Sequence, residues 1–309
     1  MAFLTNREVI LASVEASYGV DAAPVINNAM LVENPAWAHE GLRLVERNGI
    51  RPSIGKLQQL FAGTLRAISF EQEIKGSGAA GVAPEMGVPL RACGLQETIV
   101  ADTSVAYAPR NTAHESATIY YYHEGKINVL TGALGTVSFS LEVGGKGMAS
   151  FNFIGHSGPQ VDGAVPNPSY DALVPPPVIG AGFDVGGHAA VVAALSIDLG
   201  NQLATPPDMN AADGFSEVFL VMRDVNGSFD PQDTPVATVD WEGMLRSNAT
   251  AALTTGVIGS AAGNRYQIDM PKIAYRSMAP GDRDGVRTLE MGFGATEDIG
   301  DDDFILTFT

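Results

Sequence analysis

The stretch VSFSLEVGGKGMASFNFI, residues 137–154, indicates an antiparallel β-hairpin. Apolar and polar residues alternate on both sides of GGKG, and a period of two is typical of strands with one covered face. The alternate apolar residues of the first strand are expected to face a core: Val137, Phe139, Leu141 and Val143. The intervening residues form its other face: Ser138, Ser140 and Glu142. The middle of the chain therefore predicts a β protein.

The same alternation extends in both directions from this hairpin. Strands are expected around 66–74, 104–108, 116–123 and 126–130, and later around 195–199, 217–225, 272–278, 286–293 and 304–308. Leu42 and Leu44 also alternate with a polar residue and predict a strand. Short helices are expected at 7–16, 85–93 and 240–246. The fold class is mainly β, with a few short helices.

The order of these elements predicts two similar domains in tandem. Each half contains a strand, a long arm, a second strand, a short helix and a closing hairpin. Between them, residues 157–178 hold six of the 18 prolines, which predicts an extended linker. We expect domains at 1–156 and 179–309, joined by the linker 157–178. Two unrelated β-domains are the alternative.

Two arms interrupt the alternating pattern at matching places. The first is NGIRPSIGKLQQLFA at 48–62, and the second is NQLATPPDMNAAD at 201–213. Connections between paired strands usually need about 2–5 residues, and much longer loops are uncommon unless they bind something. The arms therefore indicate a subunit that contacts its neighbours.

The charge of the chain is strongly acidic and unevenly distributed. The formal net charge is −17; residues 1–155 carry 14 acidic and 11 basic side chains, and residues 156–309 carry 21 and 7. No basic stripe suited to gripping nucleic acid is present. An acidic surface would instead repel phosphates.

The motifs that suggest chemistry have simpler explanations. GSGAAG at 76–81 matches a dinucleotide fingerprint, but its preceding strand alternates and no βαβ series follows, so we interpret it as a loop. GDRDG at 281–285, even with Glu290, lacks the spacing of a calcium loop and reads as a turn. The acidic run 301–303 and the five histidines show no metal-ligand pattern. The sequence predicts no catalytic site and no cofactor.

Cellular location follows from three negative observations. Cys93 is the only cysteine and is expected to be a core residue, which leaves no intrachain disulfide. The N-terminal residues lack the pattern of a signal peptide, and no apolar run is long enough to cross a membrane. We expect the protein to fold in a cytoplasm.

Several segments resemble the major tail tube proteins of long-tailed bacteriophages. They are LASVEASYGVDAAP (11–24), AMLVENPAW (29–37), GTLRAISFEQEIKGSG (63–78), EMGVPLRACGL (85–95), TSVAYAP (103–109), IYYYHEGKINVLTGALGTVSFSLEVGGKGMASFNFIGH (119–156), LSIDLGNQLATPPDMNAADG (195–214) and PGDRDGVRTLEMGFGA (280–295). These segments span most of the chain. The resemblance rests on their number and order, because none of them is a chemical motif.

The resemblance implies a β-sandwich or split-barrel fold with a short flanking helix, present here as two tandem tail-tube domains. It implies a structural virion protein of siphovirus-like type, which polymerises into stacked rings that form the hollow tail tube through which DNA passes into the host. Most members place six single domains in each ring, so two domains per chain would give a homotrimeric ring with pseudo-sixfold symmetry. The implied partners are tape measure, tail terminator and distal tail proteins, with assembly in the host cytoplasm.

The resemblance also suggests which residues act in assembly. Ring-to-ring contacts are expected from the arms, at Arg51, Pro52, Lys56 and Leu57 and at Pro206, Pro207, Asp208 and Met209. Attraction on stacked rings between the basic residues of the first arm, Arg51 and Lys56, and Asp208 and Asp213 of the second is one possible register device. Polar strand faces are expected to line the lumen, with Glu71, Glu73, Ser138, Ser140 and Glu142 as candidates. Carboxylates there would let DNA slide without sticking.

Two alternatives remain open. One is a β-sandwich binding or decoration module on a virion or cell surface, and the other is a subunit of a secretion-system tube. Binding modules usually present clustered exposed aromatic residues. The cluster here is YYY at 120–122, and strand alternation is expected to bury one of its members.

Overall fold

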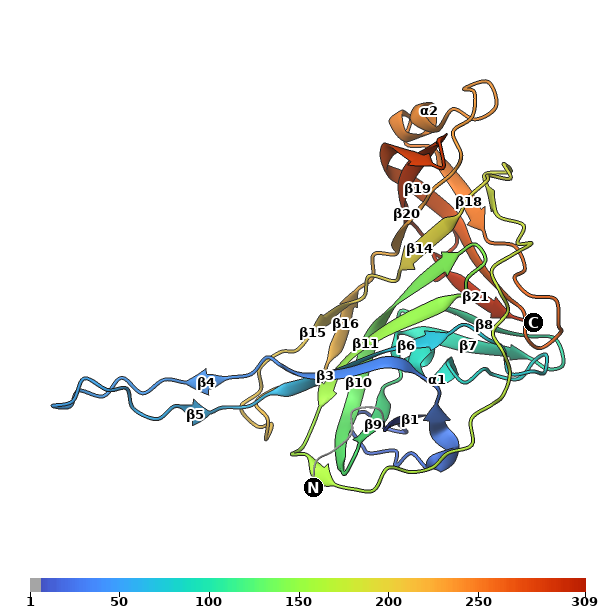
Figure 1. Cartoon of the computed structure of the whole chain (residues 1–309). Coiled ribbons are helices and arrows are strands. Elements are labelled where there is room, and N and C mark those ends of the chain that lie inside the picture. The colour runs from blue at the N-terminus through green and yellow to red at the C-terminus, as the bar shows by residue number, and fades with distance from the viewer. Residues whose placement is uncertain (1–6) are drawn as a thin grey trace.

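The computed structural model describes residues 7–309, and it is built mainly from β-strands (Figure 1). The first half contains β1 (Glu8–Val14), a 3-10 turn η1 (Ile26–Asn28), β2 (Ala29–Met30), β3 (Glu33–Glu40), β4 (Leu44–Val45), β5 (Leu60–Phe61), β6 (Leu65–Glu73), α1 (Gly87–Ala92), β7 (Leu95–Val100), β8 (Ser104–Pro109), β9 (Ala117–His123), β10 (Lys126–Glu142) and β11 (Met148–His156). The remainder contains β12 (Val161–Asp162), β13 (Asp184–Val185), β14 (Ala194–Asp198), β15 (Gln202–Ala204), β16 (Phe219–Met222), β17 (Asn226–Phe229), α2 (Trp241–Arg246), β18 (Thr250–Thr254), β19 (Tyr266–Arg283), β20 (Val286–Ala295) and β21 (Ile305–Phe308). The mainly β fold is as expected.

The main sheet repeats one order of strands. In the first half, neighbouring strands follow the order β3, β6, β11, β10, and in the second half the order is β14, β17, β20, β19. Their registers correspond as well: the row Ala36, Ser69, Asn152, Thr136 recurs as Ser196, Ser228, Gly292, Ser277. Strand β10 then pairs with β14 over 138–142 and 194–198, so the two sets of four lie in one continuous sheet.

Two further groups of strands branch from this sheet. β10 also pairs with β9 through its first residues, and β9 pairs with β1, which in turn pairs with β2. In the second half, β19 pairs with β18 and β21, and β21 pairs with β8 of the first half. Among the described strands, pairing therefore joins the two halves at β10–β14 and at β21–β8.

Aromatic side chains fill the interior. Phe70, Phe151 and Phe153 are buried and stack in the first half, with ring centroids 5.4–5.9 Å apart. Phe139 of β10 stacks on Phe304 near the C-terminus at 5.2 Å. Most of the buried apolar residues of both halves form one cluster, so burial of their large rings stabilises the halves together.

The two short helices occur where the sequence predicts them. α1 is followed by Gly94 at a φ of +79°, a left-handed conformation that glycine adopts readily at a helix C-terminus. α2 is capped by Asp240, whose Oδ1 accepts a hydrogen bond of 2.8 Å from the Gly243 backbone N–H. Both hairpins are also confirmed, by β10–β11 and by β19–β20.

The helix expected at 7–16 is wrong. Residues 8–14 form β1, which pairs with all of β9, from Glu8 opposite His123 to Val14 opposite Ala117. Four consecutive residues of β1 are buried: Val9, Ile10, Leu11 and Ala12. A strand covered on both faces shows a continuous apolar run, and a short run of this kind does not distinguish strand from helix by period.

Three strand expectations also need correction. Of 217–225 only Phe219–Met222 is a strand, and it pairs with β15 in a separate two-stranded ribbon. The counterpart of β6 in the second half is therefore β17. Leu42 precedes β4 within the first arm and is exposed, whereas the sheet strand before that arm is β3. Val143 ends the alternation of β10, and its side chain is 63% exposed rather than in the core.

The segment 157–178 is extended and crosses the length of the body (Figure 1). Only β12 within it forms a strand. It is fastened near its end, where Asn264 Nδ2 donates to the Val174 carbonyl at 2.9 Å and the buried Lys75 Nζ lies 3.5 Å from the carbonyls of Asp171 and Leu173. Within the described residues, no helix has the length and apolar character that a membrane span requires.

Candidate functional site

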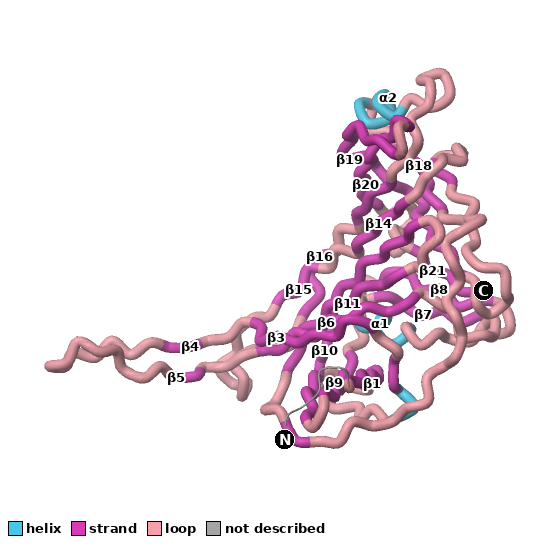
Figure 2. The backbone as a smooth tube through the Cα atoms, viewed as in Figure 1, coloured by secondary structure: helices cyan, strands magenta, loops and turns pink. Residues whose placement is uncertain are grey.

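The first arm projects far from the body (Figure 1; Figure 2). It is longer than the predicted 48–62 and spans residues 41–63, because Arg43 pairs with Ala62 and Gly63 and β4 pairs with β5. Ile50 and Ile54 at its tip are fully exposed. No described residue of this chain covers these branched apolar side chains, and exposed apolar groups of this kind are typical of interaction surfaces.

The tip of the first arm is nevertheless ordered by its own hydrogen bonds. Arg51 Nη2 donates to the Lys56 carbonyl at 2.8 Å and to the Gly55 carbonyl at 2.5 Å. Lys56 Nζ lies 3.2 Å from Glu46 Oε1. The four residues predicted for this arm (Arg51, Pro52, Lys56 and Leu57) therefore lie in one turn, with Arg51 closing it.

The second arm lies against the root of the first. It is the ribbon β15–β16 with the loop between these strands. Arg43 places its guanidinium over the ring of Phe215, with Cζ 3.8 Å from the centroid, and donates from Nη1 to the Gly214 carbonyl at 2.9 Å. Asp213 Oδ2 lies 2.6 Å from His156 Nδ1 of β11. The Arg43 contacts join the second arm to the first, and the His156 contact joins it to the first-half body.

The predicted residues of the second arm are more exposed than its base. Met209 is 97% exposed, and Pro207 is also exposed, whereas Pro206 and Asp208 are half-buried. Asp208 Oδ1 accepts a hydrogen bond of 2.8 Å from the Asn210 backbone N–H. Within this chain the arms meet through Arg43, which contacts the Phe215 ring and the Gly214 carbonyl, and pairing of Arg51 or Lys56 with Asp208 or Asp213 of a neighbouring copy stays a prediction.

One face of the main sheet is lined by small polar residues. The strand register places the five lumen candidates in adjacent rows of this face, which we call the polar face. One row runs Glu71, Ser150, Ser138, Asp198, Asn226, and the next runs Glu73, Met148, Ser140, Ser196, Ser228. Glu142 follows on the same side of β10, opposite Ala194. The opposite face of these strands carries the buried aromatic residues.

Carboxylates bind the cations that lie near the polar face. Lys146 donates to Glu33 and to Glu73, the latter at 2.9 Å, and these hydrogen bonds raise the pKa of Lys146. Arg276 Nη2 lies 2.6 Å from Asp224 Oδ1, which lowers the pKa of that carboxyl. Both cations are thus neutralised locally. Glu71 and Glu142 add negative charge, so this face offers little attraction to a polyanion.

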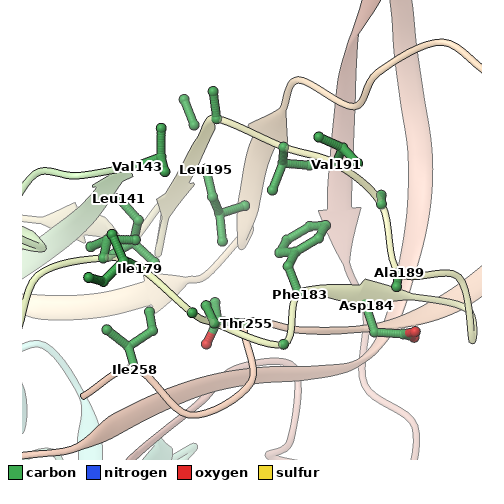
Figure 3. A pocket seen from close by; sticks show the side chains of 18 residues that line it. Leu141, Val143, Ile179, Phe183, Asp184, Ala189, Val191, Leu195, Thr255 and Ile258 are labelled. Atoms are coloured by element: carbon green, nitrogen blue, oxygen red, sulfur yellow. The ribbon is translucent and has the colours of Figure 1, made fainter. Parts of the chain in front are cut away.

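A groove at the C-terminal end of β10 was not predicted from the sequence (Figure 3). It has a volume of about 360 Å³, and apolar side chains dominate its lining. Ile179 and Ile258 stand on one side of it, and Phe183 and Val191 on the other (Figure 3). The sequence did not reveal this groove. Strand alternation predicted that Val143 lies in the core, whereas its side chain is exposed and lines the groove.

A family model described as phage tail tube protein matches residues 5–295. The chain belongs to the phage tail tube protein family. No curated protein matches it. The predicted resemblance is therefore confirmed, and with it a structural role in the tail tube of a virion. The family is one of structural proteins and not a class of enzymes.

In this tail tube protein, Gly76 and Gly78 of GSGAAG allow a close contact with the backbone at 263–264. Gly78 N donates to the Gly263 carbonyl at 3.0 Å, and Gly76 N donates to Asn264 Oδ1 at 3.0 Å. A Cβ added at Gly76 would lie 2.0 Å from the Gly263 oxygen. The motif thus packs one half of the chain against the other. Its glycines are explained without a bound phosphate.

The lone cysteine of the tail tube protein is a core residue, as predicted. Cys93 is buried, and this burial raises the pKa of its thiol. A buried thiol with a raised pKa is a poor nucleophile. Tyr121 is buried as well, so the tyrosine cluster at 120–122 does not form an exposed aromatic platform.

Proposed function

We propose that three copies of this chain form a ring with pseudo-sixfold symmetry, and that such rings stack into the hollow tube through which DNA passes into the host cell. The repeated strand order supports this proposal more than any other observation. Residues 138–142 of β10 pair with β14 of the same chain, and the corresponding part of β19, residues 279–283, pairs with β20 alone within the described chain.

The outer edge of β3 is the natural complement to the edge of β19. β3 corresponds to β14 in the repeat, and among the described strands it pairs only with β6. If β3 of the next copy takes the place of β14 beside β19, each chain continues the sheet of its neighbour. Closing the sheet around an axis removes exposed strand edges, which otherwise invite uncontrolled association.

In this ring, each half occupies one of six equivalent places. The proposed division into 1–156, 157–178 and 179–309 follows the repeated strand order, with the extended segment 157–178 as the connection. The halves share a core and a sheet, so each chain would enter the ring as one rigid pair of tube units. Three such pairs satisfy a sixfold arrangement with true threefold symmetry.

The polar face is our candidate for the lumen. Glu71, Glu73, Ser138, Ser140 and Glu142 share it, and its nearest cations are already paired. Short neutral side chains and carboxylates leave no site that grips phosphates. DNA would slide past this surface without binding, after assembly in the host cytoplasm with the other tail proteins of a siphovirus-like virion.

Electron microscopy of the concentrated protein tests this function directly. We expect tubes whose averaged cross-section shows threefold order. Six identical chains in each ring would contradict the tandem arrangement, and isolated particles at all concentrations would contradict tube formation. Deleting residues 50–60 should leave a soluble, folded subunit that forms no tubes. Tubes of normal length from that deletion would show that the first arm is not needed for the stacking of rings.

A further inference from the structure

The apolar groove and the first arm lie at opposite ends of the same strands. The arm joins the body at β6, where Arg66 is paired with Gly155 near the end of β11. The groove includes Leu141 and Val143 at the other end of β10. Next to Gly155, His156 pairs with Thr131 of β10. Ten residues separate Thr131 from Leu141, which corresponds to roughly 30 Å of strand. The arm also points away from the body, so it does not reach the groove of its own chain (Figure 1).

The groove is formed in the single chain before any partner binds. Its walls are fastened to the β10–β11 turn by backbone hydrogen bonds, from Val178 N to the Gly145 carbonyl at 2.9 Å and from Val143 N to the Ala193 carbonyl at 2.8 Å. Three of its apolar side chains remain largely exposed: Val143 at 63%, Ile179 at 58% and Val191 at 60%. A preformed groove with uncovered apolar walls binds without a large ordering cost.

The arm tip and the groove complement each other in hydrophobicity and in charge. The tip offers two uncovered branched side chains, Ile50 and Ile54, in a turn fixed by Arg51. Residues 43–61 carry four basic and one acidic side chain, in a chain whose net charge is −17. Among the residues that the structure describes, Asp184 is the one charged residue that lines the groove. A basic tip therefore suits an apolar groove whose one charged lining residue is an aspartate.

We infer that the groove receives the tip of the first arm from another copy of this chain, with Ile50 and Ile54 in contact with Val143, Ile179 and Val191. This inference rests on the proposed stacking of rings and identifies the surface that accepts the arm. Because donor and acceptor lie at opposite ends of the subunit, the contact is head-to-tail and repeats without closing on itself. An interface of that type generates an open filament of one polarity.

A photo-crosslinking experiment on assembled tubes tests the inference. The photoreactive residue p-benzoylphenylalanine replaces Ile54, and the crosslinked peptides are identified by mass spectrometry. Mixing isotopically light and heavy subunits before assembly shows which crosslinks join two copies. We expect crosslinks between copies to residues 178–195 or to Val143. The same probe at Val236, which is 72% exposed and outside both surfaces, is the control and should give no such products.

The outcomes separate this inference from the proposed function. Tubes whose Ile54 probe crosslinks elsewhere, or within its own chain, overturn the groove as the acceptor while leaving tube formation intact. A wild-type protein that forms no tubes overturns both proposals. Tubes with the expected crosslinks support both.

A pair of charge substitutions gives an independent measurement. Val191→Arg places a cation in the apolar wall, so we expect at least a tenfold loss of polymer with a circular dichroism spectrum like that of the wild type. Val236→Arg introduces the same charge at another exposed valine and should polymerise normally. Normal tubes from Val191→Arg would overturn the inference.

Discussion

Arg43, at the root of the first arm, lies with its guanidinium carbon 3.8 Å from the ring centroid of Phe215 in the second arm. The two residues are 172 positions apart and belong to different halves of the chain. Phe215 is buried although it lies in a loop, and a Cβ added at Gly41 would come within 3.0 Å of its ring. This contact makes the second arm a support for the base of the first.

Replacing Phe215 with alanine should therefore loosen both arms. Removal of a buried phenylalanine ring costs about 3 kcal/mol or more, from lost burial and the cavity left behind. We expect a loss of this size in the free energy of unfolding, measured with urea, and faster hydrogen exchange at 41–63. Phe61→Ala removes an exposed ring of the first arm and is the control, with a change below about 0.5 kcal/mol. Equal effects of the two variants would argue against the contact.

A second prediction concerns the buried carboxylate of Glu15. Its two oxygens accept hydrogen bonds from Gly19 N, Ser116 Oγ, Thr118 Oγ1 and Gly132 N, at 2.6–2.8 Å. In Glu15→Gln an amide NH₂ would face two of these donors, which leaves buried polar groups without partners. We expect a loss of about 2–4 kcal/mol in urea unfolding. The exposed Glu142→Gln should change stability little, and an equal loss in both variants would contradict this role for Glu15.

The sequence predicted the parts of the fold that local periodicity determines. Residues 137–154 alternate because one face of each strand is covered, and both of these strands formed as expected. The same reasoning failed for β1. This strand is covered on both faces and pairs with β9, so its apolar residues are consecutive and do not alternate with polar ones. Local pattern does not contain that information, since the partner strand lies about a hundred residues away.

The candidate surfaces were predictable only in part. Composition and loop length pointed to the first arm, and alternation placed the lumen candidates on one face. The groove was not predictable, because Val143, Ile179 and Val191 are brought together by contacts between distant segments. The packing of the second arm onto Arg43 was missed for the same reason. Its signal, a lone aromatic residue after Gly214, is too common to interpret without a structure.

A third prediction uses the close contact at GSGAAG. In Gly76→Ala the new methyl group would meet the Gly263 oxygen at 2.0 Å, and backbone atoms cannot yield as a flexible side chain does. We expect a loss of about 1–3 kcal/mol in thermal or urea unfolding. Gly158→Ala is the matched control, because a Cβ there meets nothing within 4 Å. Normal stability of Gly76→Ala would show that the two loops separate easily.

A fourth prediction concerns acid stability. Arg91 Nε donates to Glu115 Oε2 at 2.5 Å, and this hydrogen bond lowers the pKa of Glu115 below its usual value of 4.5. A lowered carboxyl pKa in the folded state stabilises the fold above that value, and the contribution is lost as pH falls through the folded-state pKa. Glu115→Gln should therefore cost about 0.5–1 kcal/mol at pH 7, since both side chains are partly exposed. The difference from wild type should shrink towards pH 3.

Urea unfolding at several pH values measures this effect. Glu290→Gln, at an exposed position of β20, controls for the general loss of one negative charge. A Glu115→Gln deficit that persists unchanged into acid would mean that the carboxylate charge is not its source.

The last prediction tests whether the polar face lines the lumen. Ser140 and Ser196 lie directly opposite each other on β10 and β14. Replacing both with lysine adds two cations per chain to the wall of the proposed channel, and each ring multiplies them. We expect such tubes to retain DNA at low salt and to release it as salt rises, because phosphate binding by lysine depends on counterion release. Wild-type tubes and the neutral double variant Ser140→Gln, Ser196→Gln should retain none. If the lysine tubes let DNA pass as freely as the glutamine tubes, another face of the sheet lines the channel.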